Sequence, residues 1–150
     1  MRGILIDWLV DVHLKFKLLP ETLYLTVNMI DRFLDKEVIS RRRLQLVGIA
    51  AMLISSKYEE IYPPEIKDFT YITDRAYSKQ DVLDMEGSIL DALNFNITVP
   101  SCYRFLERFA RLSNLEIAHH LNMTENGLGS TGLRTFLFAR YLTELALVDY

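Results

Sequence analysis

The chain has 150 residues, of which half are apolar, and its 17 basic and 20 acidic residues give a net charge of −3. This length predicts one domain or little more, and the apolar share predicts a sizeable buried core. The charge balance argues against broad nucleic-acid binding, which usually requires a basic excess, although Arg41, Arg42 and Arg43 form a short basic run.

The single cysteine, Cys102, excludes an internal disulfide and a cysteine-rich zinc site. It also favours a reducing compartment, the cytosol or the nucleus. We expect neither a signal peptide nor a membrane span. Asp7 and Asp11 interrupt the apolar run near the N-terminus, and no other stretch is long and uncharged enough.

Apolar residues recur with helical spacing along nearly the whole chain. Ser40 is expected to cap the third helix through its hydroxyl. Pro63 and Pro64 suit the first turn of the fourth helix, and Ser78 with Asp81 resembles a capping box at the start of the fifth. The pattern predicts helices over about residues 3–17, 22–36, 41–58, 64–71, 78–93, 101–113 and 132–148.

The segment from about 114 to 131 is polar and rich in glycine, which predicts a flexible surface loop. His119 and His120 border this loop. Adjacent residues on a helix point about 100° apart, so these histidines lack the i, i+4 spacing of a two-ligand metal face. We therefore predict no metal site.

The first predicted helix is apolar on two sides, and two interpretations remain open. A helix that is apolar all round is usually buried all round, which indicates a central core helix. Alternatively, the second side forms a surface groove for a peptide with a basic residue and a leucine, since Asp11 lies at its edge. The two sides consist of Ile6, Leu9, Val10 and Leu14, and of Met1, Ile4, Leu5, Trp8 and Val12.

The third predicted helix offers a second wall for such a groove. Small residues along this helix let neighbouring helices approach closely, which is more often a packing device than a binding site. The candidate wall residues recur at i, i+3, i+4 and i+7, and they are Arg41, Leu44, Gln45 and Gly48.

Short ordered motifs run along most of the chain. They are MRGILIDWL (1–9), ETLY (21–24), IDRFL (30–34), LQLVG (44–48), SKYEE (56–60), YITD (71–74), ME (85–86), LNF (93–95) and RYLTEL (140–145). Together they resemble the cyclin box, without a gap from residue 1 to about 97 and more weakly from 98 to 113. The pattern is most similar to mitotic A/B-type cyclins, and the SKYEE and YLTEL forms favour the B type.

The resemblance implies an all-α fold. It predicts a cyclin-box bundle of five helices around a central helix over residues 1–97. The start of a second cyclin-like helical domain would follow over residues 98–150, with a polar insertion at about 114–131.

The resemblance also implies a regulatory subunit and not an enzyme. Such a subunit binds and activates a cyclin-dependent serine/threonine kinase and helps to recruit substrates, which controls cell-cycle progression at G2/M. It needs no cofactor, and we expect it in the nucleus and the cytoplasm, without nucleic-acid or membrane binding.

Five anchors of the cyclin box have counterparts here: Arg2, Asp31, Leu46, Lys57 and Glu86. The resemblance implies that Arg2 and Asp31 form a structural ion pair between helices. It implies that Lys57 and Glu86 contact the kinase backbone, as one donor-only and one acceptor-only group can. The apolar residues expected to accompany them are Ile54, Tyr58, Ile61, Tyr62 and Phe95.

The resemblance assigns a second site to the surplus apolar side of the first helix. This substrate-docking patch would bind substrates or inhibitors that carry a basic-x-leucine motif. Asp11 stands where the family commonly has glutamate or glutamine, so its shorter side chain reaches less far. The counterparts of the patch are Met1, Ile4, Leu5, Trp8, Asp11, Arg41, Leu44 and Gln45.

Other classes of function fit less well. No glycine-rich phosphate loop follows a strand, and no spacing indicates a Ser-His-Asp or Cys-His arrangement, which argues against an enzyme. DNA-binding transcription factors that share the cyclin fold tend to be basic, whereas this chain is acidic. A cyclin-fold scaffold that does not activate a kinase remains an alternative, although the presence of both Lys57 and Glu86 argues against it.

Overall fold

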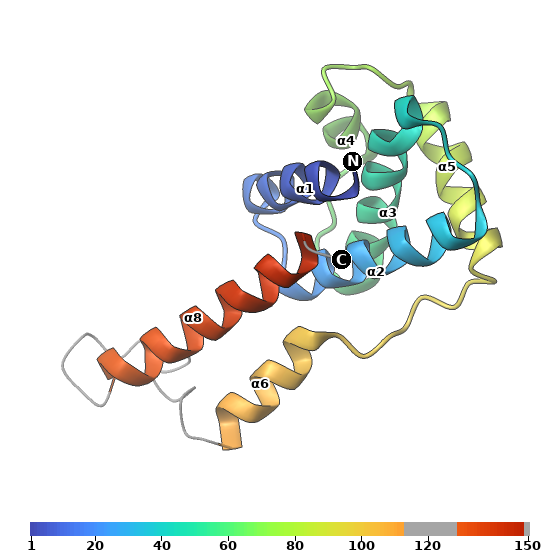
Figure 1. Ribbon diagram of the computed structural model, residues 1–150. Helices are drawn as coiled ribbons and strands as arrows, with labels where there is room; N and C mark the ends of the chain where they lie inside the picture. Colours follow the sequence, from blue (N-terminus) through green and yellow to red (C-terminus); the bar gives the residue numbers. More distant parts are fainter. Residues whose placement is uncertain (113–128, 149–150) are drawn as a thin grey trace. The chain divides into compact units, whose positions relative to one another are not determined.

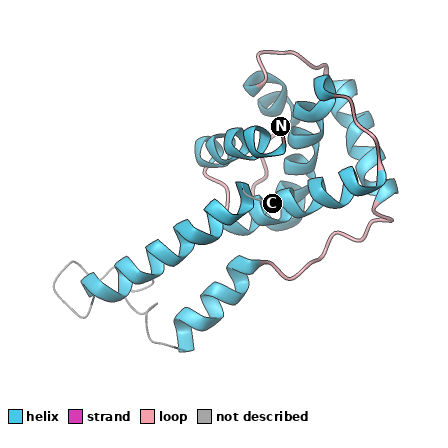
Figure 2. Ribbon diagram, viewed as in Figure 1, coloured by secondary structure: helices cyan, strands magenta, loops and turns pink. Residues whose placement is uncertain are grey.

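The computed structural model describes residues 1–112 and 129–148, and every regular element among them is a helix (Figure 2). The predicted all-α fold is therefore confirmed. The chain divides into two compact units, Met1–Val99 and Pro100–Tyr150. The helices are α1 (Arg2–Phe16), α2 (Pro20–Lys36), the 3₁₀ helix η1 (Arg41–Arg43), α3 (Leu44–Glu59), α4 (Ile66–Ile72), α5 (Lys79–Ala92), α6 (Cys102–Leu112) and α8 (Gly129–Val148).

Helix α3 is the central helix of the first unit, and α1, α2, α4 and α5 all pack against it (Figure 1). Every residue from Leu46 to Ser56 is buried, as expected of a helix that is covered on all sides. Small residues at Gly48, Ala50 and Ala51 let the surrounding helices approach closely. The predicted five-helix bundle, in which four helices surround a central one, is confirmed.

Hydroxyl groups buried in this core bond to the backbone of their own helix. Ser55 Oγ donates to the carbonyl of Ala51 at 2.9 Å, and Ser56 Oγ donates to the carbonyl of Met52 at 2.7 Å. A buried hydroxyl without a partner costs roughly 1–3 kcal/mol. These bonds therefore allow α3 to carry two serines in a fully buried turn.

Helix α1 buries a single stripe and lies on the outside of α3. The predicted division of its two apolar sides was wrong in detail. Leu14 was assigned to the first side with Ile6 and Leu9, yet it is 60% exposed, whereas Leu5 and Val12 of the second side are buried. The buried stripe takes residues from both predicted sides and follows one line along the helix. Its five residues are Leu5, Ile6, Leu9, Val12 and His13.

Two predicted helix starts were wrong. Ser40 makes no capping bond through its hydroxyl; its carbonyl accepts a hydrogen bond from the N–H of Arg43 at 2.9 Å, which closes a 3₁₀ turn before α3. The fourth helix begins after Pro63 and Pro64, at Ile66. It starts there because Glu65 and Asp68 form a capping box around its first turn.

The predicted capping box of α5 is confirmed. Ser78 Oγ accepts from the backbone N–H of Asp81 at 3.1 Å, and Asp81 Oδ2 accepts from the backbone N–H of Ser78 at 2.8 Å. The Ser78 hydroxyl also donates to that carboxylate at 2.6 Å. The Asp81 carboxylate thus accepts one hydrogen bond from the Ser78 hydroxyl and one from its backbone N–H. Both bonds, and most of all the one from the hydroxyl, lower the pKa of Asp81 because they favour its charged form.

A carboxylate that follows α3 stabilises the start of α2. Glu60 Oε1 accepts from the backbone N–H of Leu19 at 2.7 Å and from the hydroxyl of Thr22 at 2.5 Å. The first N–H groups of a helix lack partners inside the helix, and the helix dipole is positive there. Glu60 therefore links the C-terminal end of α3 to the N-terminal end of α2.

The second unit contains α6 and α8, which contact each other. Ser101 Oγ accepts from the N–H of Arg104 at 3.2 Å and so caps the start of α6. The guanidinium of Arg140 lies 6.0 Å from the centre of the Tyr103 ring and donates to Glu144 at 2.9 Å.

Most of the predicted loop over 114–131, with His119 and His120, lies outside the described residues. Residues 129–131 belong to α8, so the predicted start of that helix at 132 was too late. The assignment of the second unit to a partial cyclin-like domain stays a prediction.

We predict that Gly48→Val destabilises the first unit by about 1–3 kcal/mol, because a Cβ at Gly48 would lie only 2.9 Å from Leu5 Cδ1. Urea unfolding followed by the fluorescence of Trp8, the one tryptophan, measures this change.

Gly87→Ala is the matched control. A Cβ at Gly87 meets nothing within 4 Å, so this change on α5 should stabilise the helix by about 0.5–1 kcal/mol. Equal stability of Gly48→Val and the parent chain would show that close contact between α1 and α3 is not a constraint.

Candidate partner-binding surfaces

An ion pair joins α1 to α2. Arg2 Nε donates to Asp31 Oδ1 at 2.6 Å, and Arg2 Nη2 donates to Asp31 Oδ2 at 2.8 Å, so the guanidinium holds both carboxylate oxygens. The two side chains are 22% and 28% exposed. This pair is therefore neither fully buried nor a solvated surface pair, and its role in the described structure is to hold two helices together.

A second ion pair joins α3 to α5. Lys57 Nζ donates to Glu86 Oε1 at 2.6 Å and to Oε2 at 2.9 Å. The side chain of Lys57 is 46% exposed, whereas that of Glu86 is only 13% exposed. Lys57 also lies in the last turn of α3, where the helix dipole favours a cation. The carboxylate thus holds an ammonium group that solvent, or a partner, can still reach.

Most of the apolar residues predicted to accompany Lys57 are on the surface: Tyr58, Ile61, Tyr62 and Phe95 are all exposed. Ile54 is not, because it is only 3% exposed and falls inside the buried stretch of α3. Ile54 is therefore a core residue, and its predicted place on a contact surface was wrong.

Two of these aromatic residues are constrained: Phe95 by an unusual backbone conformation and Tyr58 by a hydrogen bond of its side chain. Asn94 and Phe95 have φ angles of 50° and 55°, a left-handed conformation that is unusual for a bulky aromatic residue. The N–H of Phe95 donates to the carbonyl of Leu90 at 2.9 Å, and the Tyr58 hydroxyl bonds to Thr98 Oγ1 at 2.5 Å. Strained residues often mark functional sites, so an exposed ring on such backbone is a candidate contact.

The residues of the predicted docking patch come from α1, η1 and the start of α3. Unlike the other residues of the patch, Leu5 is buried: it is only 7% exposed, and its side chain packs onto Gly48. It supports the patch from below and is not a contact residue. The others are exposed or partly exposed: Met1, Ile4, Trp8, Asp11, Arg41, Leu44 and Gln45.

The part of the chain that the structure describes contains no cluster of three or more His, Cys, Asp or Glu side chains that could hold a metal ion. No described helix is long and apolar enough to span a membrane.

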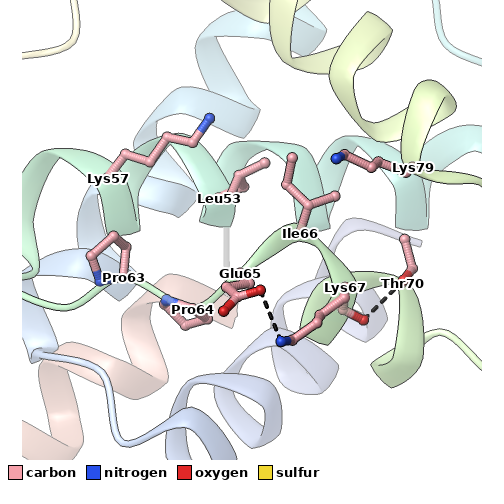
Figure 3. Close-up of a pocket in the computed structure, with 9 residues that line it drawn as sticks. All are labelled: Leu53, Lys57, Pro63, Pro64, Glu65, Ile66, Lys67, Thr70 and Lys79. Carbon is pink, nitrogen blue, oxygen red and sulfur yellow. Dashed lines mark hydrogen bonds and ion pairs between the residues drawn. The ribbon is translucent and has the colours of Figure 1, made fainter.

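Sequence reasoning missed a surface pocket of about 560 Å³ beside Lys57 (Figure 3). It forms because Pro63 and Pro64 interrupt the chain after α3 and the following segment packs back along that helix. The proline pair was the one signal of this pocket in the sequence, and it indicated only a break. The lining residues are Leu53, Lys57, Pro63, Pro64, Glu65, Ile66, Lys67, Thr70 and Lys79.

Comparison with known proteins identifies the family. The family model described as the N-terminal domain of cyclins matches residues 1–98. The chain belongs to the cyclin family. The rice (Oryza sativa subsp. japonica) protein Cyclin-A2-1 is 49% identical over the whole chain, and Cyclin-B1-3 of Arabidopsis thaliana is 58% identical over 113 residues, 75% of the chain. The G2/mitotic-specific cyclin-B of Patella vulgata is 47% identical over the whole chain.

These relatives are A-type and B-type cyclins, and the one from Patella vulgata is named as G2/mitotic-specific, which confirms the predicted resemblance. The chain spans 28%, 27% and 33% of their respective lengths. A viral cyclin from herpesvirus saimiri has the same fold, with a TM-score of 0.77 and 25% identity. That match covers 98% of this chain and 59% of the viral one.

We predict that a double-mutant cycle on Arg2 and Asp31 (each to Ala, then both) gives a coupling free energy of about 1 kcal/mol in urea unfolding. Partly shielded, two-pronged pairs lie at the upper end of the range of about 0.2–1 kcal/mol measured for exposed pairs.

The pair Lys67–Glu65 serves as the control, because its side chains are 72% and 70% exposed. A cycle on that pair should show no measurable coupling. Equal coupling in the two pairs would contradict a structural role specific to Arg2 and Asp31.

Proposed function

We propose that this chain is part of a regulatory subunit that binds and activates a cyclin-dependent serine/threonine kinase and thereby regulates the cell cycle at G2/M, in the nucleus and cytoplasm. The observation that carries the proposal is the Lys57–Glu86 pair across α3 and α5, whose ammonium group is accessible, in a chain of the cyclin family. The subunit acts by binding and not by catalysis, and it needs no cofactor.

The pair suits recognition of another protein's backbone. An ammonium group donates and a carboxylate accepts, so together they satisfy carbonyl and N–H groups at an interface. Exposed aromatic residues supply the apolar contacts from which interfaces draw most of their affinity. Three exposed residues are of this kind: Tyr58 lies in the last turn of α3, Tyr62 follows that helix, and Phe95 follows α5.

Activation follows from preferential binding. A protein kinase is active when its strand lysine pairs with the glutamate of its C-helix and its activation segment is open. A subunit that binds this arrangement more tightly than the inactive one shifts the kinase toward it. Rigid helices that hold Lys57 and Glu86 in fixed positions are suited to this role, and the phosphoryl transfer remains the kinase's own chemistry.

We also propose that the patch formed by Met1, Ile4, Trp8, Asp11, Arg41, Leu44 and Gln45 docks substrates or inhibitors with a basic-x-leucine motif. Trp8 and its neighbours offer apolar surface to the leucine, and the exposed carboxylate of Asp11 offers a partner to the basic residue. Gln45 and Lys57 are twelve residues apart on α3, about 18 Å along its axis, so the two sites are separate.

The kinase proposal predicts that the chain activates an inactive mitotic cyclin-dependent kinase toward histone. Lys57→Ala and Glu86→Ala should each weaken kinase binding by about 10- to 100-fold, since each leaves a desolvated group unpaired. Calorimetry measures affinity, and a histone assay measures activation.

Lys15→Ala, on the exposed side of α1, is the control and should change neither quantity. Stable binding without activation would favour a non-activating scaffold. A folded chain that does not bind the kinase would contradict the proposal.

The docking proposal predicts that Trp8→Ala weakens phosphorylation of a substrate with a basic-x-leucine motif by about tenfold. Phosphorylation of a short peptide without the motif should stay unchanged. Loss of both activities in a folded variant would show that the patch and the kinase surface are one site.

A further inference from the structure

The pocket beside Lys57 has one apolar wall and a positively charged rim. Ile66 at the start of α4 is half-buried and offers apolar surface to a ligand, whereas Leu53 of α3, which also lines the pocket, is buried (Figure 3). Pro63 and Pro64 add rigid apolar surface without backbone N–H groups. This wall suits an aliphatic side chain and offers little to a purely polar ligand.

The rim has an excess of cations. Three lysines and one glutamate line the pocket. Lys57 is paired with Glu86, and Lys67 is paired with Glu65 at 2.9 Å. Lys79, the first residue of α5, makes no ion pair with any residue that the structure describes. The charge that an incoming ligand can neutralise is therefore that of Lys79.

The position of the pocket indicates which partner reaches it. Lys57 belongs both to the pocket and to the proposed kinase-binding surface, so a kinase that covers Lys57 also covers one end of the pocket. Pro63 and Pro64 line the pocket together with Lys57, so its apolar surface extends to that end. The same partner can thus extend from the ion pair toward Lys79.

We propose that the pocket receives a segment of the partner kinase in which an aliphatic side chain lies next to a carboxylate. The aliphatic group packs against Ile66 and the two prolines, and the carboxylate pairs with the Lys79 ammonium. This inference rests on the proposed kinase binding and adds to it a specific ionic contact at the far end of the pocket.

The test is the affinity of the chain for the kinase in a charge series at position 79: the parent Lys79, then Lys79→Gln and Lys79→Glu. Reversing the charge should weaken binding roughly tenfold at low salt, and the neutral variant should lie between. Raising the salt concentration should narrow the difference, because ions screen the contact.

Misfolding is not expected in this series. Position 79 is an exposed first-turn position of α5, where the helix dipole favours a carboxylate, so Lys79→Glu should keep or raise stability. Urea unfolding checks this. Lys15→Glu makes the same charge change on α1 and should bind the kinase as the parent does.

The outcomes separate this inference from the proposal on which it rests. If Lys57→Ala weakens binding while Lys79→Glu binds like the parent, the kinase contacts the ion pair but does not enter the pocket, and the inference is wrong. If neither variant changes the affinity, the proposed kinase surface itself is wrong. A salt-independent loss at Lys79→Glu would also overturn the ionic contact.

Discussion

Helix α3 is buried on every side from Leu46 to Ser56, and this burial determines which of its residues can meet a partner. Only its ends are left for recognition. Leu44 and Gln45 are partly exposed at the first end, beside η1, and Lys57 and Tyr58 are exposed at the last. The proposed docking patch and the proposed kinase surface therefore lie at the two ends of one core helix, and the rigidity of the core keeps them at a fixed separation.

The ion pairs of the first unit show how similar chemistry serves different ends. Both side chains of the Arg2–Asp31 pair are partly shielded from solvent, and the pair joins α1 to α2. Lys57–Glu86 is shielded mainly at the carboxylate, which leaves the ammonium half-exposed. Glu60 turns its carboxylate toward the start of α2 and is likewise committed to the fold. Exposure, more than residue type, separates the candidate contact from the two structural links.

Much of the fold could be predicted from the sequence because helical spacing and helix-capping residues are local signals. The Ser78–Asp81 capping box depends on residues three positions apart, and it was predicted correctly. Errors arose where the answer depended on a neighbouring helix. The exposure of Leu14 and the burial of Ile54 depend on where other helices pack, and no local pattern records that.

The candidate sites divide in the same way. The family motifs pointed to Lys57 and Glu86, which the fold brings together although 29 positions separate them in the chain. Lys79 belongs to no motif and was missed, because its proximity to Lys57 arises only when α4 and α5 pack against α3. Contacts between distant segments have no signature in a single sequence, so a pocket lined by three such segments becomes visible only in the folded chain.

Rigidity is the property that unites these surfaces. Binding costs conformational entropy when side chains must be ordered, and groups that are already held in place avoid that cost. Glu86 holds Lys57, Thr98 holds the Tyr58 hydroxyl, and a left-handed turn fixes the backbone of Phe95. The strain at Phe95 lowers the stability of the chain, and the buried core around α3 offsets that cost. A fold that holds the backbone of an exposed aromatic residue in one conformation is suited to selecting one conformation of a partner, as the proposed kinase activation requires.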